Sequence, residues 1–229
     1  MRILVLSRKR SLYSTRRLRE EGERRGHTVE VADPLKCVLL MKDGEASILV
    51  SGRRLKPPAA ILPRIGTAGT EYSISVIRHF ELMGVPVVNG HEAVGRAKNK
   101  LGCLQHLAAR GVPVPDTLIS RYPRDLDRLM KLLGGPPVIM KLLRGTQGTG
   151  VIYAESKASV ESMLETIWSL GEDILVQRFI AESKGKDVRV LVIGGKVRAA
   201  MRRIAREGEF RSNIHRGAVG EPVVLSKTV

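Results

Sequence analysis

Short apolar runs alternate with amphipathic stretches along residues 1–90, and this pattern predicts a sheet covered by helices. Strands are predicted at residues 2–6, 28–31, 59–62 and 85–88, helices at 14–25 and 72–83, and a small hairpin at 48–55. Strands that alternate with helices imply a parallel, doubly wound sheet, whose ligands bind beyond the carboxyl ends of the strands. The sequence PRIGT, residues 63–67, follows one of these strands and lies at such an end.

The pattern changes near residue 112, where we place a boundary between two lobes. A helix predicted over residues 91–110 ends at Gly111, and the two prolines of VPVP, residues 112–115, enforce an extended crossover. A small α+β unit follows, with strands near residues 117–120, 138–142, 151–154 and 174–179, helices near 126–133 and 159–170, and a hairpin of 188–193 with 197–204. The predicted fold class is therefore α/β.

Composition and cysteine usage are those of a globular protein in a reducing compartment. Hydrophobic residues make up 43% and charged residues 27% of the chain. No apolar run approaches the ~20 residues that span a bilayer, and no secretory signal follows Met1. Cys37 and Cys103 lie far apart without a CxxC pattern, which indicates reduced thiols. We expect a cytoplasmic protein with no membrane partner.

The formal charge of +16 indicates a negatively charged partner but does not identify its class. A surface this basic attracts nucleotides, acidic peptides, ribosomes or nucleic acid. Part of the charge has a simpler origin, because residues 16–25 mix Arg with Glu at helical pair spacing, as on a solvated helix face. Aromatic residues, at 3%, are too scarce to favour stacking on RNA bases.

The strongest local motif is KLLRGTQGTGV, residues 141–151, in which a strand that carries Lys141 leads into a loop with Gly145, Gly148 and Gly150. Glycines let backbone N–H groups turn toward a phosphate, and a nearby lysine supplies positive charge. The spacing GxxGxG matches neither a Walker loop nor the GxGxxG fingerprint. An ordinary glycine-containing hairpin would look similar, so the loop alone leaves both interpretations open.

An ordered set of motifs surrounds this loop: KNKLGCLQHLAARGVPVPDT at 98–117, VQRFI at 176–180, DVR at 187–189 and RRIAREGEFRSNIHRG at 202–217. Together with PRIGT, these motifs resemble the ATP-grasp ligases, and most closely the RimK family of ribosomal protein modification glutamate ligases. The resemblance runs from Met1 to about Gly217. It implies an N-terminal Rossmann-like pre-ATP-grasp domain over residues 1–98 and an ATP-grasp domain over 99–229. The latter would have a small lobe at about 115–180 and an incomplete large lobe at 181–229.

The resemblance also implies a nucleotide site. Lys100 and Lys141 would hold the phosphates of ATP while the glycine loop closes over them. Gln177 would accept a hydrogen bond from the adenine amino group, and Asp187 would bind the ribose hydroxyls. The backbone at Arg178, Phe179 and Ile180 would form the adenine hinge, although the family commonly has an acidic residue where Arg178 stands. The alternatives are a solvent-exposed Lys100 and an Asp187 that caps a turn or pairs with Arg189.

Catalysis is expected from the arginines of the last motif. Arg202, Arg203 and Arg211 would face the γ-phosphate and the developing acyl phosphate, where guanidinium groups suit planar anions. Only one of the adjacent pair should face the site, because neighbours in a strand alternate faces. Ser212 and Asn213 would follow as neutral polar groups at the phosphate or metal. A basic surface loop is the alternative for this whole stretch.

In members of the family, magnesium is held by an Asp and a Glu-x-Asn pair, and residues 1–229 do not contain these ligands in the expected order. The histidines show no metal-binding spacing either, so no metal ligand is assigned and the magnesium ligands are expected beyond residue 229. This chain alone should then be nearly inactive.

The resemblance implies a ligase that uses ATP and Mg²⁺ to add L-glutamate to the C-terminal carboxylate of a small-subunit ribosomal protein or a glutamate chain, through an acyl phosphate. Partners would be ATP, L-glutamate, an acidic acceptor peptide and further copies of the chain in a homo-oligomer. A non-catalytic module that binds nucleotide or acidic peptide is the alternative from another class, and a basic RNA-associated protein is the third.

Overall fold

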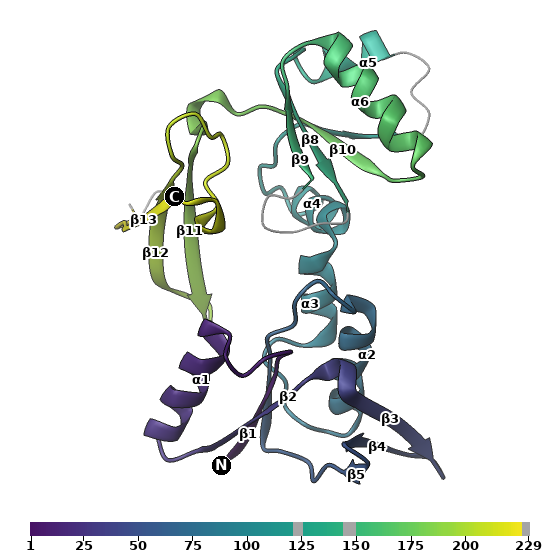
Figure 1. Ribbon diagram of the computed structural model, residues 1–229, viewed down its shortest axis with the longest axis vertical. Coiled ribbons are helices and arrows are strands. Elements are labelled where there is room, and N and C mark those ends of the chain that lie inside the picture. Colours follow the sequence, from purple (N-terminus) through teal and green to yellow (C-terminus); the bar gives the residue numbers. More distant parts are fainter. Residues whose placement is uncertain (121–125, 144–149, 226–229) are drawn as a thin grey trace. The chain divides into compact units, whose positions relative to one another are not determined.

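The computed structural model describes residues 1–120, 126–143 and 150–225. Its contacts divide the chain into two compact units, Met1–His106 and Leu107–Val229, each with its own sheets and helices (Figure 1). Among the described residues, no helix has the length and apolar character needed to cross a membrane. The mixed α/β class expected from the sequence is confirmed.

Unit 1 is built on a parallel sheet in the order β2-β1-β6. The central strand β1 (Arg2–Leu6) pairs with β2 (Thr28–Ala32) on one side and with β6 (Ala60–Pro63) on the other. Helix α1 (Tyr13–Arg24) connects β1 to β2, and α2 (Thr70–Leu82) follows β6. Leu6 and Ile61 are fully buried against Ile77 and Phe80 of α2, so this face of the sheet forms the core of the unit.

A second, antiparallel sheet in unit 1 is larger than the sequence pattern indicated. The predicted hairpin at residues 48–55 corresponds to β4 (Glu45–Val50) and β5 (Arg53–Arg54), but β3 (Cys37–Lys42) also pairs with β4. The short 3₁₀ helix η1 (Pro34–Lys36) precedes β3. The turn between β3 and β4 has positive φ at Asp43 (53°) and Gly44 (79°), the geometry of a tight hairpin.

Two predictions in unit 1 were wrong. Residues 85–88 do not form a strand. Val87 makes only an isolated bridge to Ile61, since Pro86 has no N–H to give to a ladder. The helix predicted over 91–110 is broken into α3 (His91–Lys98) and α4 (Lys100–Ala108). Asn99 between them is extended, and its Oδ1 accepts a hydrogen bond from Gly102 N at 2.9 Å, so the side chain competes with the continuous helix.

Unit 2 contains a four-stranded sheet in the order β7-β10-β8-β9. Its strands are β7 (Thr117–Ile119), β8 (Val138–Leu142), β9 (Val151–Ala154) and β10 (Ile174–Arg178). Figure 1 shows α5 (Leu126–Leu132) and α6 (Lys157–Ser169) on one face of this sheet. Val138, Met140 and Val176 point to that face and are buried with the helices. Because side chains alternate along a strand, Ile139, Lys141 and Gln177 point to the opposite face.

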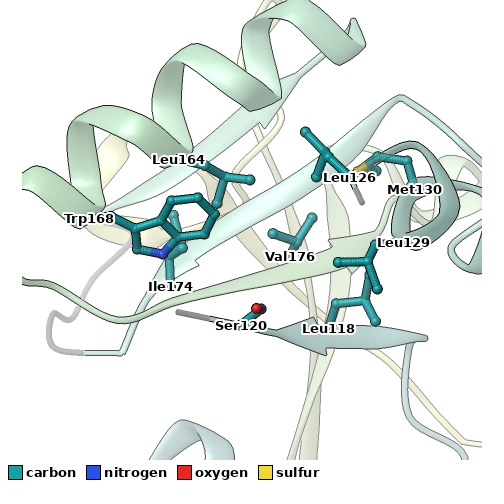
Figure 2. A pocket seen from close by; sticks show the side chains of 9 residues that line it. All are labelled: Leu118, Ser120, Leu126, Leu129, Met130, Leu164, Trp168, Ile174 and Val176. Atoms are coloured by element: carbon teal, nitrogen blue, oxygen red, sulfur yellow. The ribbon is translucent and has the colours of Figure 1, made fainter. Parts of the chain in front are cut away.

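The core under the helices contains a narrow apolar pocket (Figure 2). Its volume of about 20 Å³ has room for roughly one water molecule. The indole Nε1 of Trp168 is buried here and has no hydrogen-bond partner within the described ranges. The lining is apolar apart from Ser120 and this indole, and it includes no charged side chain, which makes the pocket a packing feature rather than a nucleotide site.

The chain then forms an antiparallel sheet in the order β11-β12-β13. The predicted hairpin is confirmed as β11 (Lys186–Ile193) and β12 (Lys196–Ile204), joined by Gly194 and Gly195 with positive φ. The third strand β13 (Val219–Pro222) was not predicted. Short 3₁₀ helices η2 (Ala181–Ser183) and η3 (Ile214–Arg216) lie before β11 and β13.

Candidate nucleotide site

An open cavity of about 320 Å³ lies in unit 2, on the sheet face opposite to α5 and α6. Its lining comes from β8 to β12, from the residue two positions before β7 and from the segment between β12 and η3. It consists of Pro115, Ile139, Lys141, Val151, Gln177, Arg178, Phe179, Ile180, Ser183, Lys184, Lys186, Asp187, Arg203, Phe210, Arg211, Ser212 and Asn213.

One wall of the cavity carries a chain of polar contacts across β8, β10 and β7. Lys141 Nζ donates to Gln177 Oε1 at 2.5 Å, and Gln177 Nε2 donates to Thr117 Oγ1 at 2.7 Å. The Thr117 hydroxyl in turn donates to the Pro115 carbonyl oxygen at 2.7 Å. Gln177 is only 3% exposed, so a fixed orientation of its amide is needed to satisfy both ends of the group. The contacts place the Lys141 ammonium at the cavity surface with a defined direction.

Another part of the cavity wall is built on the second pair of the β11-β12 ladder. Asp187 lies across from Arg203, whose Nε donates to Asp187 Oδ1 at 2.7 Å and whose Nη2 donates to Oδ2. Ser212 Oγ also donates to Asp187 Oδ2, at 2.6 Å. Burial of the Asp187 carboxyl acts to raise its pKa, but the hydrogen bonds from Arg203 and Ser212 and the arginine's charge outweigh it, so the pKa lies below the ordinary value.

Arg211 is held by an acidic neighbour in its own loop. Its Nε and Nη2 donate to Glu209 Oε1 and Oε2 at 2.9 and 2.8 Å, and the Arg211 backbone N–H donates to Oε1 at 3.0 Å. The side-chain hydrogen bond from Arg211 is the main reason that the pKa of Glu209 falls to about 2. Glu209 therefore stays charged at neutral pH and fixes the guanidinium at the cavity edge.

An apolar, aromatic part of the lining adjoins these charged walls. The Tyr153 ring meets Phe179 edge-on, with ring centroids 4.9 Å apart, and lies 5.7 Å from the Phe210 centroid. Phe179, Ile180 and Phe210 line the cavity. Within the described part of the chain, the Ile180 N–H has no hydrogen-bond partner, whereas the Arg178 N–H is taken by the Asp116 carbonyl at 2.9 Å.

The charge of the lining is strongly one-sided. It includes six cationic side chains and one carboxylate, and the cations are Lys141, Arg178, Lys184, Lys186, Arg203 and Arg211. The carboxylate, Asp187, is already paired with Arg203. A cavity with an apolar end and an excess of positive charge is complementary to a polyanion that carries a flat ring system.

The structure brings most of the predicted site residues to this one cavity: Lys141, Gln177, Arg178, Phe179, Ile180, Asp187, Arg203, Arg211, Ser212 and Asn213. It also separates the adjacent arginines, because Arg203 lines the cavity while Arg202 is exposed on the other face of β12. Asp187 pairs with Arg203 rather than with Arg189, which differs from the alternative considered from sequence.

Four predicted site residues, three glycines and one lysine, are not among the described residues that line the cavity. Gly145 and Gly148 lie outside the described residues. Gly150 is described, with φ of 71°, and a Cβ added there would come within 2.8 Å of the Leu142 side chain. Lys100 belongs to unit 1, where burial lowers the pKa of its ammonium group.

Four residues that line the cavity or hold its wall were not predicted from the sequence: Thr117, Lys184, Lys186 and Phe210. Lys184 and Lys186 lie in no motif that indicates a binding role, and single lysines are common in a chain this basic. Phe210 lies within a quoted motif, but a single phenylalanine there indicates no particular role. Thr117 stood within a quoted motif, but its contact with Gln177 joins residues 60 positions apart and depends on the β7-β10 pairing.

The described residues contain no group of three or more His, Cys, Asp or Glu side chains that could hold a metal ion. Magnesium prefers carboxylate oxygens, and the one carboxylate of the cavity is occupied by Arg203 and Ser212. These residues therefore fit a nucleotide but not a magnesium ion.

Comparisons with known proteins match nearly the whole chain. A sequence model described as the RimK PreATP-grasp domain matches residues 1–94, and one described as the RimK-like ATP-grasp domain matches residues 97–229. The chain is 47% identical over 226 residues to a probable alpha-L-glutamate ligase of Thioalkalivibrio sulfidiphilus, a match that covers 99% of this chain and 75% of that protein. It is also 47% identical to the ribosomal protein bS6–L-glutamate ligase of Salmonella schwarzengrund, with the same coverage.

Solved structures share the fold at lower identity. The ATP-grasp ligase PsnB, complexed with a phosphomimetic variant of its minimal precursor, Mg and ADP, has a TM-score of 0.73 at 23% identity over 99% of this chain and 78% of that chain. A RimK domain ATP-grasp protein from Sphaerobacter thermophilus has a TM-score of 0.66 at 23% identity, over 87% of this chain and 72% of that chain.

Proposed function

We propose, from the premise that this chain belongs to the RimK family of ATP-grasp ligases, that its cavity binds ATP for the transfer of L-glutamate to a peptide carboxylate. Members of the family are ATP-dependent glutamate ligases, so ATP and glutamate follow from membership. The acceptor, the intermediate and the role of each residue are proposals.

The observation that carries the proposal is the cavity's division into an apolar end and a cationic wall. The purine would lie against Phe179 and Ile180, where the Ile180 N–H is available as a hinge donor among the described residues. Gln177 Oε1 keeps one lone pair besides the one that accepts from Lys141, so it could also accept from the adenine amino group. Lys141 would neutralise the phosphates.

Asp187 is proposed to bind the ribose hydroxyls. Its carboxylate is 39% exposed on the side chain even though it pairs with Arg203, which leaves acceptor capacity toward the cavity. The lowered pKa keeps Asp187 ionised at neutral pH, and its Oδ1, which accepts only from Arg203 Nε, keeps one lone pair for a ribose hydroxyl. Ser212 and Asn213 would supply neutral polar contacts beside it.

The proposed chemistry has two steps whose atoms balance. An oxygen of the acceptor carboxylate attacks the γ-phosphorus of ATP, the bond to the bridging oxygen breaks, and ADP leaves with that oxygen. The neutral amine of L-glutamate then attacks the carbonyl carbon of the acyl phosphate, phosphate leaves, and the amide nitrogen releases one proton to solvent.

Arg203 and Arg211 are proposed to stabilise the charge that spreads over the transferred phosphoryl group. Both are held by carboxylates, Asp187 and Glu209, so little side-chain entropy is lost when they meet the phosphates. Arg202 lies outside the cavity lining, and a direct contact with the phosphates is not supported for it. Of the adjacent pair, Arg203 is therefore the proposed catalytic residue.

Magnesium does not fit the described residues, and no step is assigned to it. We propose that its ligands belong to the part of the relatives that this chain does not match, since the match covers 75% of their length. The acceptor is proposed to be the carboxylate end of a ribosomal protein or a growing glutamate chain, and the name of the Salmonella relative supports a ribosomal protein. The reaction is proposed to take place in the cytoplasm.

The test is a mass measurement on an acidic peptide that ends in a free carboxylate, incubated with ATP, Mg²⁺ and L-glutamate. One reaction uses the 229-residue chain, and a second uses the same chain joined to the segment of the Thioalkalivibrio relative that the match leaves out. We expect ATP binding by both proteins, and added glutamyl units only with the second. Equal addition by the first would show that the metal ligands lie within residues 1–229, and no addition by either would reject the proposed reaction.

A further inference from the structure

The order of strands in unit 1 reverses at the carboxyl ends of β1 and β6. The chain leaves β1 for β2 on one side, and β6 lies on the other. The first residues after these two strands adjoin, because Arg64 N donates to the Leu6 carbonyl oxygen at 2.8 Å. In open parallel sheets, ligands bind in the crevice at such a reversal.

Two cations from distant parts of the chain meet at this edge. Arg64 is exposed, and its Nη2 donates to Ser14 Oγ, in the first turn of α1, at 3.2 Å. Lys98, the last residue of α3, donates from Nζ to the carbonyl oxygens of Ile65 and Gly66 at 3.2 and 3.0 Å. The PRIGT segment therefore carries one cation of its own and binds another through its backbone. The exposed residues that follow Ser7, at positions 8–10, are also basic.

Among the described residues, no carboxylate pairs with these cations where they meet. Within residues 1–120, neither Arg64 nor Lys98 forms an ion pair with an acidic side chain that the structure describes. The acid that follows β2, Asp33, accepts from Leu35 N at 3.0 Å as the cap of η1. Burial, and then the charge of Arg64, lower the pKa of the Lys98 ammonium. Within the described part of the chain, the positive charge of this edge is thus not offset by a carboxylate, and like charges held together without a counter-ion destabilise the free protein.

The N-terminus of helix α1 adds to the positive potential at this edge of the sheet. Its N-cap residue, Leu12, makes no side-chain capping contact, and its first turn contains no acidic residue. The partial positive charge of the helix N-terminus is therefore not offset by a side chain there. The Ser14 hydroxyl, bound to Arg64, supplies a neutral donor beside it.

We propose that Arg64, Lys98 and Ser14 form a binding site for a carboxylate substrate at the β1-β6 edge of unit 1. The carboxylate would replace the missing counter-charge, with the planar Arg64 guanidinium as its fork-shaped partner and the Lys98 ammonium as a point charge. The ligand class rests on the proposed function: free L-glutamate and the acidic acceptor peptide both present this group. The cation contacts themselves do not depend on that function.

The experiment is an NMR titration of the ¹⁵N-labelled 229-residue chain, which detects weak binding site by site. The probes are L-glutamate, a peptide ending in two glutamates with a free carboxylate, and ATP in a separate titration. We expect either carboxylate probe to shift the backbone amides of Ser14 and Gly66 and the Nε–H of Arg64 in a saturable way. Saturation by L-glutamate alone identifies the amino-acid site, and saturation by the peptide alone identifies the acceptor site.

Matched variants test the two cations. Arg64→Gln and Lys98→Gln each remove one charge but keep an amide donor for Ser14 or for the PRIGT carbonyls, so the fold is retained. Each should weaken carboxylate binding by about tenfold or more, the effect of losing a charged hydrogen bond. Arg53→Gln removes the same charge from an exposed position on β5 and should bind like the wild type.

The inference is overturned if neither probe shifts Ser14 and Gly66 in the wild type, or if both variants titrate like Arg53→Gln. The ATP titration separates this result from the proposed function. Carboxylate binding without ATP binding would reject the nucleotide assignment and leave the site in place. ATP binding without any shift by a carboxylate probe would reject the carboxylate site and leave the nucleotide assignment in place.

Discussion

Replacement of Lys141 by Ala should weaken ATP binding by roughly 1.5 to 3 kcal/mol, the range for a hydrogen bond to a charged group. The corresponding rise in Kd is about 10- to 150-fold. The loss should be partial because five other cations line the cavity. The wall itself should survive, since Gln177 keeps its 2.7 Å bond to Thr117 after its 2.5 Å bond to Lys141 is lost.

The assay is calorimetric titration of the 229-residue chain with ATP at fixed ionic strength, because screening would otherwise change the contribution of each charge. Lys131→Ala is the matched control: it removes the same charge from an exposed position on α5, outside the cavity lining. Affinity in Lys131→Ala should equal that of the wild type. If Lys141→Ala binds ATP as tightly as Lys131→Ala does, then the cavity is not the phosphate site and the assignment of the lysine is wrong.

Three further predictions follow from the same contacts. Asp187→Asn should reduce the preference for ATP over the 2′-deoxy nucleotide, measured as a ratio of Kd values, and an unchanged ratio would argue against the ribose contact. The pKa of Glu209 is lowered to about 2, so the stability it contributes is complete above its ordinary pKa of 4.5 and is lost as pH falls toward 2. Glu209→Gln should therefore lower Tm at pH 7, and the difference from wild type should vanish in thermal melts as pH falls from 4.5 to 2. Gly150→Ala should lower Tm more than Gly171→Ala does. Both glycines have positive φ, but only a Cβ at Gly150 would meet the Leu142 side chain, so equal shifts would contradict that contact.

The elements that could be predicted from sequence are those with strong local periodicity. Strand β8 was predicted with its observed bounds, and β1 likewise, because each is a short, mostly apolar run. Strands β3 and β13 were missed since their side chains are largely exposed and show no alternation that separates a buried face. The break at Asn99 was also missed, because a side-chain cap inside an apolar, helix-periodic stretch leaves the period intact.

For the site, residue identity was easier to predict than residue pairing. Motif order indicated Lys141, Gln177, Asp187 and the arginines, and the structure gathers all of these except Arg202 at one cavity. The partners of these residues depend on strand register. Asp187 meets Arg203 because β11 and β12 pair with Lys186 opposite Ile204, and a shift of one residue would bring a different side chain to the cavity.

The pairing has a consequence for how charge is used in this cavity. Three of the six cationic side chains, Arg178, Arg203 and Arg211, are paired with the carboxylates of Asp116, Asp187 and Glu209. A bound polyanion therefore meets three further cations, Lys141, Lys184 and Lys186, of which Lys141 is oriented by Gln177. Held arginines are well suited to a transition state, since their position costs little at the moment of reaction, whereas lysines on flexible stems are suited to attracting the ground-state phosphates. The two kinds of cation thus divide binding from catalysis: loss of Lys141 should act mainly on nucleotide affinity, and loss of Arg203 mainly on turnover.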